Sequence, residues 1–387
     1  MPWSLIFLSL TLASWAYWLV ASWCVASFFA EAQPEPDPDP PPVSILKPVR
    51  GIDSEAYKNF SSFMLQDYGA DYEVLFGVTD PRDPVVEVVH RLKREFPKRR
   101  IEVFVAPPCG ANDKVNVLCH LAKQARHDLL VVCDSDMRVT PEYLRRICAP
   151  LRDPSVGLVT SLYRGDHAQT LTAKLEAQYI GTTFLPGILV GRRYLRMGFA
   201  LGATNALRRQ QLEQIGGFEA LANYLADDYQ LGARVAATGH RVHLSDYITQ
   251  SILGATTFRE QWNREVRWAK CVRVSRSLEY PGFLFTLCTP LSLLTAAVMG
   301  FSALGLGAIA VSLVLRWLVS WQVARHTGDA VFRRSWFWLP LRDVLTAAIW
   351  CAAWMGREVT WRGRRFALRK GGFLQQLFTQ EAHEAAR

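Results

Sequence analysis

Residues 3–30 carry no charged side chain, and this run constrains the fold more than any other feature of the sequence. A helix needs about 20 apolar residues to cross the hydrocarbon layer of a membrane, which is roughly 30 Å thick. The run has no basic segment before it and is too long for the apolar part of a cleaved signal peptide. We therefore predict that residues 3–30 form a retained N-terminal transmembrane anchor.

The C-terminal third of the chain contains two further apolar stretches. Residues 282–322 are about twice as long as one span and contain Met299 and Gly300 near their middle, so they predict a transmembrane hairpin. Residues 336–357 are also apolar but include Arg342 and Asp343. Because charged residues inside a membrane are costly, this third segment is either a functional span or an interfacial or re-entrant piece.

The distribution of basic residues predicts the orientation in the membrane. The first 46 residues contain no Lys or Arg, whereas residues 43–281 are rich in both, so the positive-inside rule places this segment in the cytoplasm. The basic tail, residues 358–387, should be cytoplasmic too. A full crossing by the third segment would put this tail outside, which argues against a simple crossing.

The net charge of +9 narrows the class of partner. It fits a membrane surface and a phosphate-bearing ligand better than nucleic acid, since no basic run is interleaved with stacking aromatic residues. The eight cysteines show no C-x-x-C and no paired spacing, which predicts reduced cytoplasmic thiols.

The middle of the chain alternates between two periodicities. A Pro-rich linker at residues 31–42 is followed by a domain over residues 43–281 in which strand-like apolar runs alternate with helical segments such as "NVLCHLAKQA". This alternation predicts an α/β fold with a mainly parallel sheet covered on both faces. The strand-like runs are at residues 43–46, 72–78, 101–105, 128–133 and 156–162.

Acidic residues follow two of these predicted strands. "YEVLFGVTD" ends on Asp80 and "DLLVVCDSD" ends on Asp134 and Asp136. In open α/β sheets ligands bind beyond the carboxyl ends of the strands, so these residues are candidates for a binding site. There is neither G-x-G-x-x-G after a strand nor a Walker sequence, which disfavours a dinucleotide-dependent dehydrogenase and a P-loop enzyme.

The pair Asp134 and Asp136 presents a charge conflict, because two carboxylates so close together favour protonation of one of them. A divalent cation that also binds substrate phosphates would resolve the conflict, and Mg²⁺ commonly uses one or two carboxylates in such sites. The alternatives are a solvated loop pair and an N-cap of the helix that follows.

Asp80 and Lys114 are further candidates for donor binding. Asp80 could accept hydrogen bonds from a nucleoside, although a turn residue before Pro81 explains it equally well. Asn112 or Asp113 can cap the next helix, which would place Lys114 in its first turn beside amide groups that attract anions. Lys114 could therefore contact a diphosphate, or its side chain could simply be solvated.

Two later motifs suggest a base and a set of cations. "YLADDYQLGARV" places Asp227 and Asp228 at a predicted helix start, where one could act as a general base or both could simply complement the helix dipole. "REVRWAK" places Arg264 and Arg267 on one helical face with Trp268 beside them. These guanidinium groups could clamp a diphosphate, or the helix could be a basic amphipathic one at the membrane.

Taken in order, these motifs resemble the D, D-x-D, D and (Q/R)-x-x-R-W series of membrane-bound GT-A glycosyltransferases. The series is Asp80, Asp134 with Asp136, Asp228, and Arg264 with Arg267 and Trp268. No single motif is specific to this group of enzymes, but the four motifs in this order between membrane segments are. The resemblance implies a GT-A fold with N-terminal and C-terminal transmembrane helices.

The sequence is most similar to the ceramide glucosyltransferase-like family, through "SILKPVRG", "NDKVN", "CDSDMRV", "LADDY" and "WRGRRFALRKGG". Segments such as "FLPGILV", "GATNALRR" and "IGGFEALANYLADDYQLG" look most like a bacterial branch associated with hopanoid biosynthesis. That likeness implies transfer of N-acetylglucosamine from UDP to a bacteriohopanetetrol-type lipid, in a multi-pass protein of the bacterial inner membrane. Glucose transfer from UDP-glucose to ceramide is the alternative.

One departure bears on the metal and on the acceptor. Animal ceramide glucosyltransferases read D-S-G where this chain has Asp134, Ser135 and Asp136. The second acid restores a full D-x-D, which favours Mg²⁺ or Mn²⁺ at Asp136 and Asp134 and makes ceramide less certain as the acceptor.

The resemblance also implies an inverting displacement. Asp228 would deprotonate the lipid hydroxyl, Asp80 would hold the uridine, and Lys114, Arg264 and Arg267 would offset charge on the leaving diphosphate. Rival interpretations are a processive polysaccharide synthase, which would need more spans, an inactive nucleotide-sugar-binding or lipid-binding scaffold, and a nucleotidyltransferase.

Overall fold

The structure, a computed structural model, describes residues 2–195 and 197–377. Within these residues the chain forms two compact units built from separate stretches of sequence. The helical unit comprises the residues up to 31, residues 164–195 and residues 253–371. The sheet unit comprises residues 32–163, 197–252 and 372–377.

The sheet unit contains a mixed eight-stranded sheet with the order β3-β2-β1-β4-β7-β6-β8-β5. Its first four strands are parallel, as predicted, whereas β7 pairs antiparallel with β4 and β6, and β5 pairs antiparallel with β8. The strands are β1 (Val43–Pro48), β2 (Tyr72–Val78), β3 (Arg100–Val105), β4 (Leu129–Cys133), β5 (Met137–Arg138), β6 (Val156–Ala168), β7 (Thr204–Arg208) and β8 (Arg241–Gly254).

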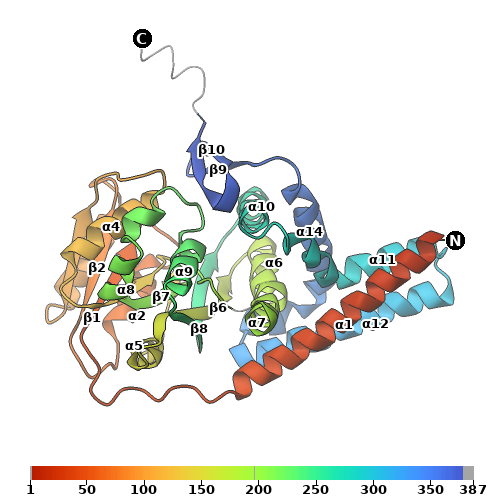
Figure 1. Cartoon of the computed structure of the whole chain (residues 1–387), viewed down its shortest axis with the longest axis horizontal. Coiled ribbons are helices and arrows are strands. Elements are labelled where there is room, and N and C mark those ends of the chain that lie inside the picture. The colour runs from red at the N-terminus through yellow and green to blue at the C-terminus, as the bar shows by residue number, and fades with distance from the viewer. Residues whose placement is uncertain (1, 196, 378–387) are drawn as a thin grey trace, which may run out of the picture. The chain divides into compact units, whose positions relative to one another are not determined.

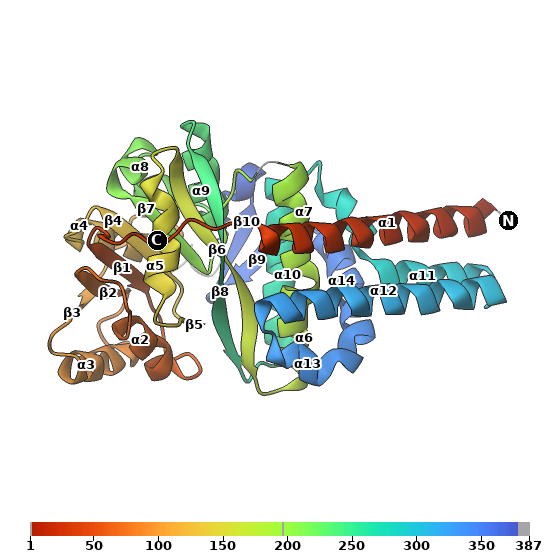
Figure 2. The same ribbon diagram turned by 90° about the horizontal axis from the view of Figure 1, so that it is seen from below.

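Every residue of β1, β2 and β4 is buried, so both faces of these strands are covered, since successive side chains point to opposite sides. Ile45 belongs to the core that includes residues of α2, α3 and α5, whereas its neighbour Leu46 belongs to the core that includes residues of α4, α8 and α9. Figure 2 shows α2 and α3 on one side of β1 to β3 and α4 and α8 on the other. The helices are α2 (Ala56–Met64), α3 (Val85–Glu95), α4 (Asp113–Gln124), α5 (Tyr143–Cys148), α8 (Arg209–Gln214) and α9 (Asp227–Ala237).

The helical unit is built around three apolar helices, α1, α11 and α12, which lie side by side (Figure 1 and Figure 2). Polar side chains join them, with Trp15 donating to the Ser312 hydroxyl at 2.7 Å and Ser22 donating to Gln322 at 2.6 Å. Such interhelical hydrogen bonds are typical of membrane helices. The helices are α1 (Pro2–Ala30), α6 (Leu171–Tyr179), the π-helix η2 (Ile180–Phe184), α7 (Leu185–Tyr194), α10 (Phe258–Ser275), η4 (Tyr280–Thr286), α11 (Cys288–Val298), α12 (Ala303–Thr327), α13 (Ala330–Ser335), η5 (Trp336–Trp338) and α14 (Leu339–Ala353).

Two of the described helices are long and apolar enough to cross a membrane, over Trp3–Ala30 and Ala303–Thr327. The short pair η4 and α11 would give a third span if counted as one, but it is bent by 72°. The chain reverses between α11 and α12 at Gly300, whose φ of 62° suits glycine. These helices are those of a membrane-associated protein.

The third apolar stretch folds as α14, which is 15 residues long. At 1.5 Å per residue it measures about 22 Å, less than the roughly 30 Å hydrocarbon layer, so a straight crossing is unfavourable. Arg342 and Asp343 are both buried within the helical unit. After α14 the chain forms a short antiparallel hairpin of β9 (Glu358–Trp361) and β10 (Arg364–Leu368).

Candidate active site

The aspartates of the D-x-D motif lie directly after β4, at the carboxyl end of the parallel strands. The Ser251 hydroxyl donates to Asp136 Oδ2 at 3.0 Å, and the Ile252 amide donates to the Asp136 carbonyl at 2.9 Å. Both donors are on β8, which pairs with the short strand β5 that follows the motif. This antiparallel pairing holds the second aspartate in place.

Lys114 joins the D-x-D motif to the acidic pair on α9. Its ammonium group lies 2.6 Å from Asp134 Oδ1 and 3.3 Å from Asp227 Oδ2. These carboxylates raise the pKa of Lys114 despite its burial, so it stays charged. The structure therefore places Lys114 inside a carboxylate cluster, which disfavours the alternative of a merely solvated lysine.

The sequence around Lys114 explains its position. Asn112 caps α4, because its side chain accepts from the backbone N–H groups of Lys114 and Val115 at 3.0 and 3.3 Å. The Asn112 side chain also donates to the Tyr224 carbonyl at 2.8 Å. Asn112 thus fixes both the start of α4 and the segment that leads into α9.

Asp227 and Asp228 begin α9 and have different surroundings. Asp227 pairs with Lys114, whereas Asp228 Oδ1 accepts from the Tyr229 amide at 2.8 Å. A Cβ atom added at Gly202 would lie 3.2 Å from Asp228 Oδ2 and 3.5 Å from Asp134 Oδ2. Gly202 therefore lets the two carboxyl groups approach the same stretch of backbone.

Two of these carboxyl groups, those of Asp136 and Asp228, have a pKa near neutral pH. Loss of hydration on burial, together with the neighbouring Asp134 and Asp53, raises the pKa of Asp136 to about 7. Burial and the adjacent Asp227 likewise raise the pKa of Asp228 to about 7, against the opposing effect of Lys114. A pKa near the working pH suits a general base.

Lys47, which was not among the predicted site residues, also lies near the carboxyl ends of the parallel strands. It is fully buried near the end of β1, donates to the Asp134 carbonyl at 2.9 Å, and lies 3.7 Å from the centre of the Phe63 ring. Burial lowers its pKa, against the raising effect of the nearby acids. Because β1 pairs with β4, its position in the sheet order was the signal that could have identified it.

The donor set fits a hard divalent cation whose coordination is completed by substrate. No group of three His, Cys, Asp or Glu side chains able to hold a metal occurs within residues 2–195 and 197–377. Asp136 and Asp134 nevertheless offer carboxylate oxygens, and Mg²⁺ commonly binds one or two carboxylates plus substrate phosphates. The interacting cluster contains five carboxylates and two lysines, an excess of negative charge. Its members are Asp53, Asp134, Asp136, Asp227, Asp228, Lys47 and Lys114.

Asp80 has the geometry of an exposed turn residue. It follows β2, accepts from the Arg82 amide at 2.9 Å, and pairs with the Arg82 side chain at 3.3 Å. These contacts lower its pKa. They match the turn interpretation, and the nucleoside contact of Asp80 stays a prediction.

The arginine–tryptophan motif lies on α10 in the helical unit, which begins with a capping box of Thr257 and Glu260. Arg264 forms a two-pronged ion pair with the buried Glu176, at 2.7 and 2.5 Å. Arg267 has no carboxylate partner among the described residues, and its burial and the nearby Arg264 lower its pKa to about 10. Of the two motif arginines, Arg267 is thus the one without a carboxylate partner within residues 2–195 and 197–377, and the partly buried Trp268 follows it on α10.

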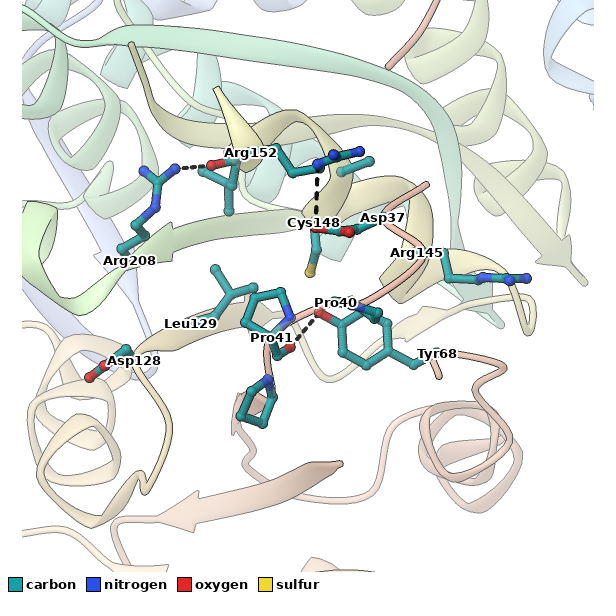
Figure 3. Close-up of a pocket in the computed structure, with 13 residues that line it drawn as sticks. Asp37, Pro40, Pro41, Tyr68, Asp128, Leu129, Arg145, Cys148, Arg152 and Arg208 are labelled. Carbon is teal, nitrogen blue, oxygen red and sulfur yellow. Dashed lines mark hydrogen bonds and ion pairs between the residues drawn. The ribbon is translucent and has the colours of Figure 1, made fainter. Parts of the chain in front are cut away.

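A cavity of about 420 Å³ lies near Leu129, at the amino end of β4 and thus at the opposite end of this strand from Asp134 (Figure 3). The linker forms one wall, where the Tyr68 hydroxyl donates to the Pro41 carbonyl at 2.7 Å and Arg152 lies 3.4 Å from Asp37. The length of β4 separates the cavity from Asp134, so the cavity is distinct from the carboxylate cluster. The linker in this structure is packed against the sheet unit.

The mixed sheet, with acids and lysines at the carboxyl ends of its parallel strands, has the architecture of a GT-A glycosyltransferase. Among solved structures, the mannosyltransferase PcManGT from Pyrobaculum calidifontis is similar, with a TM-score of 0.53 and 18% identity. The similarity covers 91% of this chain and 97% of that chain. This likeness shows the fold.

The chain belongs to glycosyl transferase family 21, because the family pattern matches residues 6–374. Ceramide glucosyltransferases 1 and 3 of Caenorhabditis elegans are each 26% identical to this chain. The matches cover 85% of this chain in both cases, and 72% and 73% of the relatives. The predicted resemblance to ceramide glucosyltransferase-like enzymes is confirmed, and the protein is a glycosyltransferase.

Proposed function

We propose that the protein is a membrane-bound inverting glycosyltransferase that moves a sugar from a UDP-sugar to the hydroxyl group of a membrane lipid. The observation that carries this proposal is Asp228, a carboxyl group with a pKa near 7, in the same cluster as Lys114 and the D-x-D motif. The family membership supports sugar transfer, and the apolar helices α1 and α12 support a lipid acceptor.

In this mechanism Asp228 acts as the base. Its carboxylate takes the proton of the acceptor hydroxyl, and the oxygen attacks the anomeric carbon on the face opposite UDP. The bond from the anomeric carbon to the β-phosphate oxygen breaks, and UDP leaves with the bonding electrons. Asp227 is less suited to this role, because its carboxylate is already paired with Lys114.

The remaining site residues bind the donor and offset its charge. Lys114 and Arg267 would stabilise the leaving diphosphate, Arg264 would orient α10 through Glu176, and Trp268 would pack beside them. Asp80 would contact the uridine. A divalent cation held by Asp136 and Asp134 would neutralise charge on the diphosphate. The solved mannosyltransferase from Pyrobaculum calidifontis is a complex with GDP-mannose and Mn²⁺, which supports Mn²⁺ or Mg²⁺ here.

For the substrates we propose N-acetylglucosamine from UDP and a hopanoid of the bacteriohopanetetrol type. The support is the resemblance of segments such as "FLPGILV" and "GATNALRR", and the second acid of the D-x-D motif. Glucose transfer to ceramide is the second candidate, favoured by the names of the two Caenorhabditis elegans relatives. The location that goes with the first candidate is the bacterial inner membrane, with the sheet unit in the cytoplasm.

Purified protein in lipid vesicles tests these assignments. Radiolabelled UDP-N-acetylglucosamine or UDP-glucose is supplied with a hopanoid tetrol or with ceramide, and label in the lipid fraction is measured with and without chelator. We expect label from UDP-N-acetylglucosamine in the hopanoid, and loss of transfer on chelation. Labelled ceramide would favour the second candidate, and neither lipid product nor UDP release would indicate an inactive scaffold.

A further inference from the structure

Two thiols of the sheet unit lie in contact outside the acidic cluster. Cys109 Sγ and Cys119 Sγ are 3.3 Å apart. Cys109 is exposed in the loop before α4, whereas Cys119 is buried within α4. The spacing of the two cysteines does not predict this contact, because nine residues separate them and a helix must begin between them to bring the sulfur atoms together.

We propose that Cys109 and Cys119 are a redox modification site. A small disulfide such as oxidised glutathione oxidises the two thiols to a reversible Cys109–Cys119 disulfide bond, which slows sugar transfer. The effect on transfer rests on the function proposed above. The formation of the bond rests only on the position of the two sulfur atoms.

The exposure of the two thiols sets the order of the reaction. Cys109 loses its proton and attacks a sulfur of oxidised glutathione, which forms a mixed disulfide and releases one glutathione thiol. The Cys119 thiol then loses its proton, attacks Cys109 Sγ and releases the second glutathione. The two cysteines lose two electrons and two protons, and the oxidant gains them as two thiols. Burial raises the pKa of Cys119, so the second step is the slow one.

Bond formation must move the exposed loop. The sulfur separation has to fall from 3.3 Å to about 2.05 Å. Cys119 packs in the hydrophobic core of the sheet unit and has little freedom. The Cys109 thiol and amide both donate to Asn116 Oδ1, at 3.1 and 3.0 Å, and the thiol bond is lost on oxidation. We therefore expect the loop that contains Cys109 and Gly110 to move when the bond forms, and Cys119 to stay in place.

This loop is connected to the proposed base through backbone contacts. A Cβ atom at Gly110 would lie 2.5 Å from the Ala222 carbonyl, so the two segments already touch closely. The Asn112 amide donates to the same carbonyl at 2.8 Å, and the Ala111 amide donates to Asn223 Oδ1 at 3.0 Å. The segment from Ala222 leads directly into α9 and Asp228, so displacement of the loop reaches the acidic cluster.

The experiment uses the full-length protein in lipid vesicles, reduced and then incubated with oxidised glutathione. Trypsin cleaves after Lys114, between the two cysteines, so the bond appears in mass spectrometry as a linked pair of peptides. We expect this pair, together with a drop in transfer on the order of tenfold, since displacements of about 1 Å at a reacting centre can cost up to 10²-fold. Dithiothreitol should remove the linked pair and restore the rate.

Matched variants separate this site from other thiols. Cys109→Ser and Cys119→Ser should keep the basal rate and become insensitive to the oxidant, whereas Cys351→Ser, which removes an exposed thiol of the helical unit, should stay sensitive. Absence of the linked peptides, an unchanged rate when they form, or insensitivity of the Cys351 variant would each overturn the proposal. The peptide assay needs no substrate, so it distinguishes failure of this inference from failure of the proposed function.

Discussion

Asp227 and Asp228 are adjacent in sequence but chemically different. The carboxylate of Asp227 pairs with Lys114, whereas Asp228 lies against Gly202 with a pKa near 7. Sequence alone could not choose between them, because both begin the same helix and both suit its dipole. The choice depends on which face of α9 meets the N-terminal turn of α4, which is a tertiary feature.

The pKa of Asp228 predicts the pH dependence of transfer. Only the ionised carboxylate can take a proton, and burial beside Asp227 raises the pKa of Asp228 to about 7. We therefore expect kcat/KM to rise with pH up to about 7 and then to level off, since kcat/KM reports ionisation in the free enzyme. Initial rates measured across a buffer series check this. An acid limb near pH 4, the ordinary range for aspartate, would contradict the assignment.

Gly202 provides a second prediction at the scale of single residues. Gly202→Ala would place a Cβ atom 3.2 Å from Asp228 Oδ2, so that carboxyl group must shift. We expect transfer to fall on the order of tenfold with little change in thermal unfolding, because catalysis is more sensitive than folding to small displacements. Gly198→Ala is the matched control, since its Cβ atom would make an ordinary contact of 3.6 Å with Ala236. Equal rates for the two variants would contradict the role of Gly202.

At the scale of elements, buried ion pairs connect α10 to the apolar helices of the helical unit. Arg342 on α14 forms two hydrogen bonds of 2.9 Å with Glu265 on α10. Its neighbour Asp343 accepts from Arg316 on α12 at 2.7 and 3.0 Å. The charges that made the third apolar stretch ambiguous thus pair within the helical unit, and Glu265 is next in sequence to Arg264, which pairs with Glu176.

These pairs predict an asymmetric response to mutation. Arg342→Met leaves the carboxylate of Glu265 buried without its partner, which should cost about 3–5 kcal/mol. The double variant with Glu265→Leu removes both charges and should recover most of that loss. Thermal unfolding in detergent measures both. Equal destabilisation of the single and double variants would show that the pair itself, and not the unpaired charge, determines stability.

Sequence patterns were informative for elements with strong local signals and poor for the rest. The apolar runs predicted β1 to β4 within two residues and the first half of β6, because strands buried in the core read as continuous apolar sequence. The strands β5, β7 and β8 were missed, and β5 in particular has only two residues and depends on pairing with Ser251 and Gln250 far along the chain. The hydrogen bond from Ser251 to Asp136 could not be predicted for the same reason, since the two residues are far apart in sequence.

At the scale of the whole molecule, the candidate residues are divided between the two units. The sheet unit contains the proposed base and the proposed metal ligands, and the helical unit contains Arg267, Trp268 and the apolar helices. The order of the motifs predicted the fold class and the family, because that order is shared by the family and does not depend on side-chain contacts. It did not predict that Arg264 is paired with Glu176, or that Lys47 completes the cluster. The division into membrane segments and their orientation stay predictions.

The most direct test of the account is the behaviour of Asp228→Asn in vesicles that contain donor and acceptor. The amide keeps the size of the side chain but cannot take the acceptor's proton, so we expect kcat to fall by about 10²–10⁴-fold while UDP binding is kept. Asp227→Asn, which weakens the contact with Lys114, is the control and should retain more activity. If Asp228→Asn transfers sugar at a rate close to that of the unmodified protein, Asp228 is not the base and the proposed mechanism is wrong.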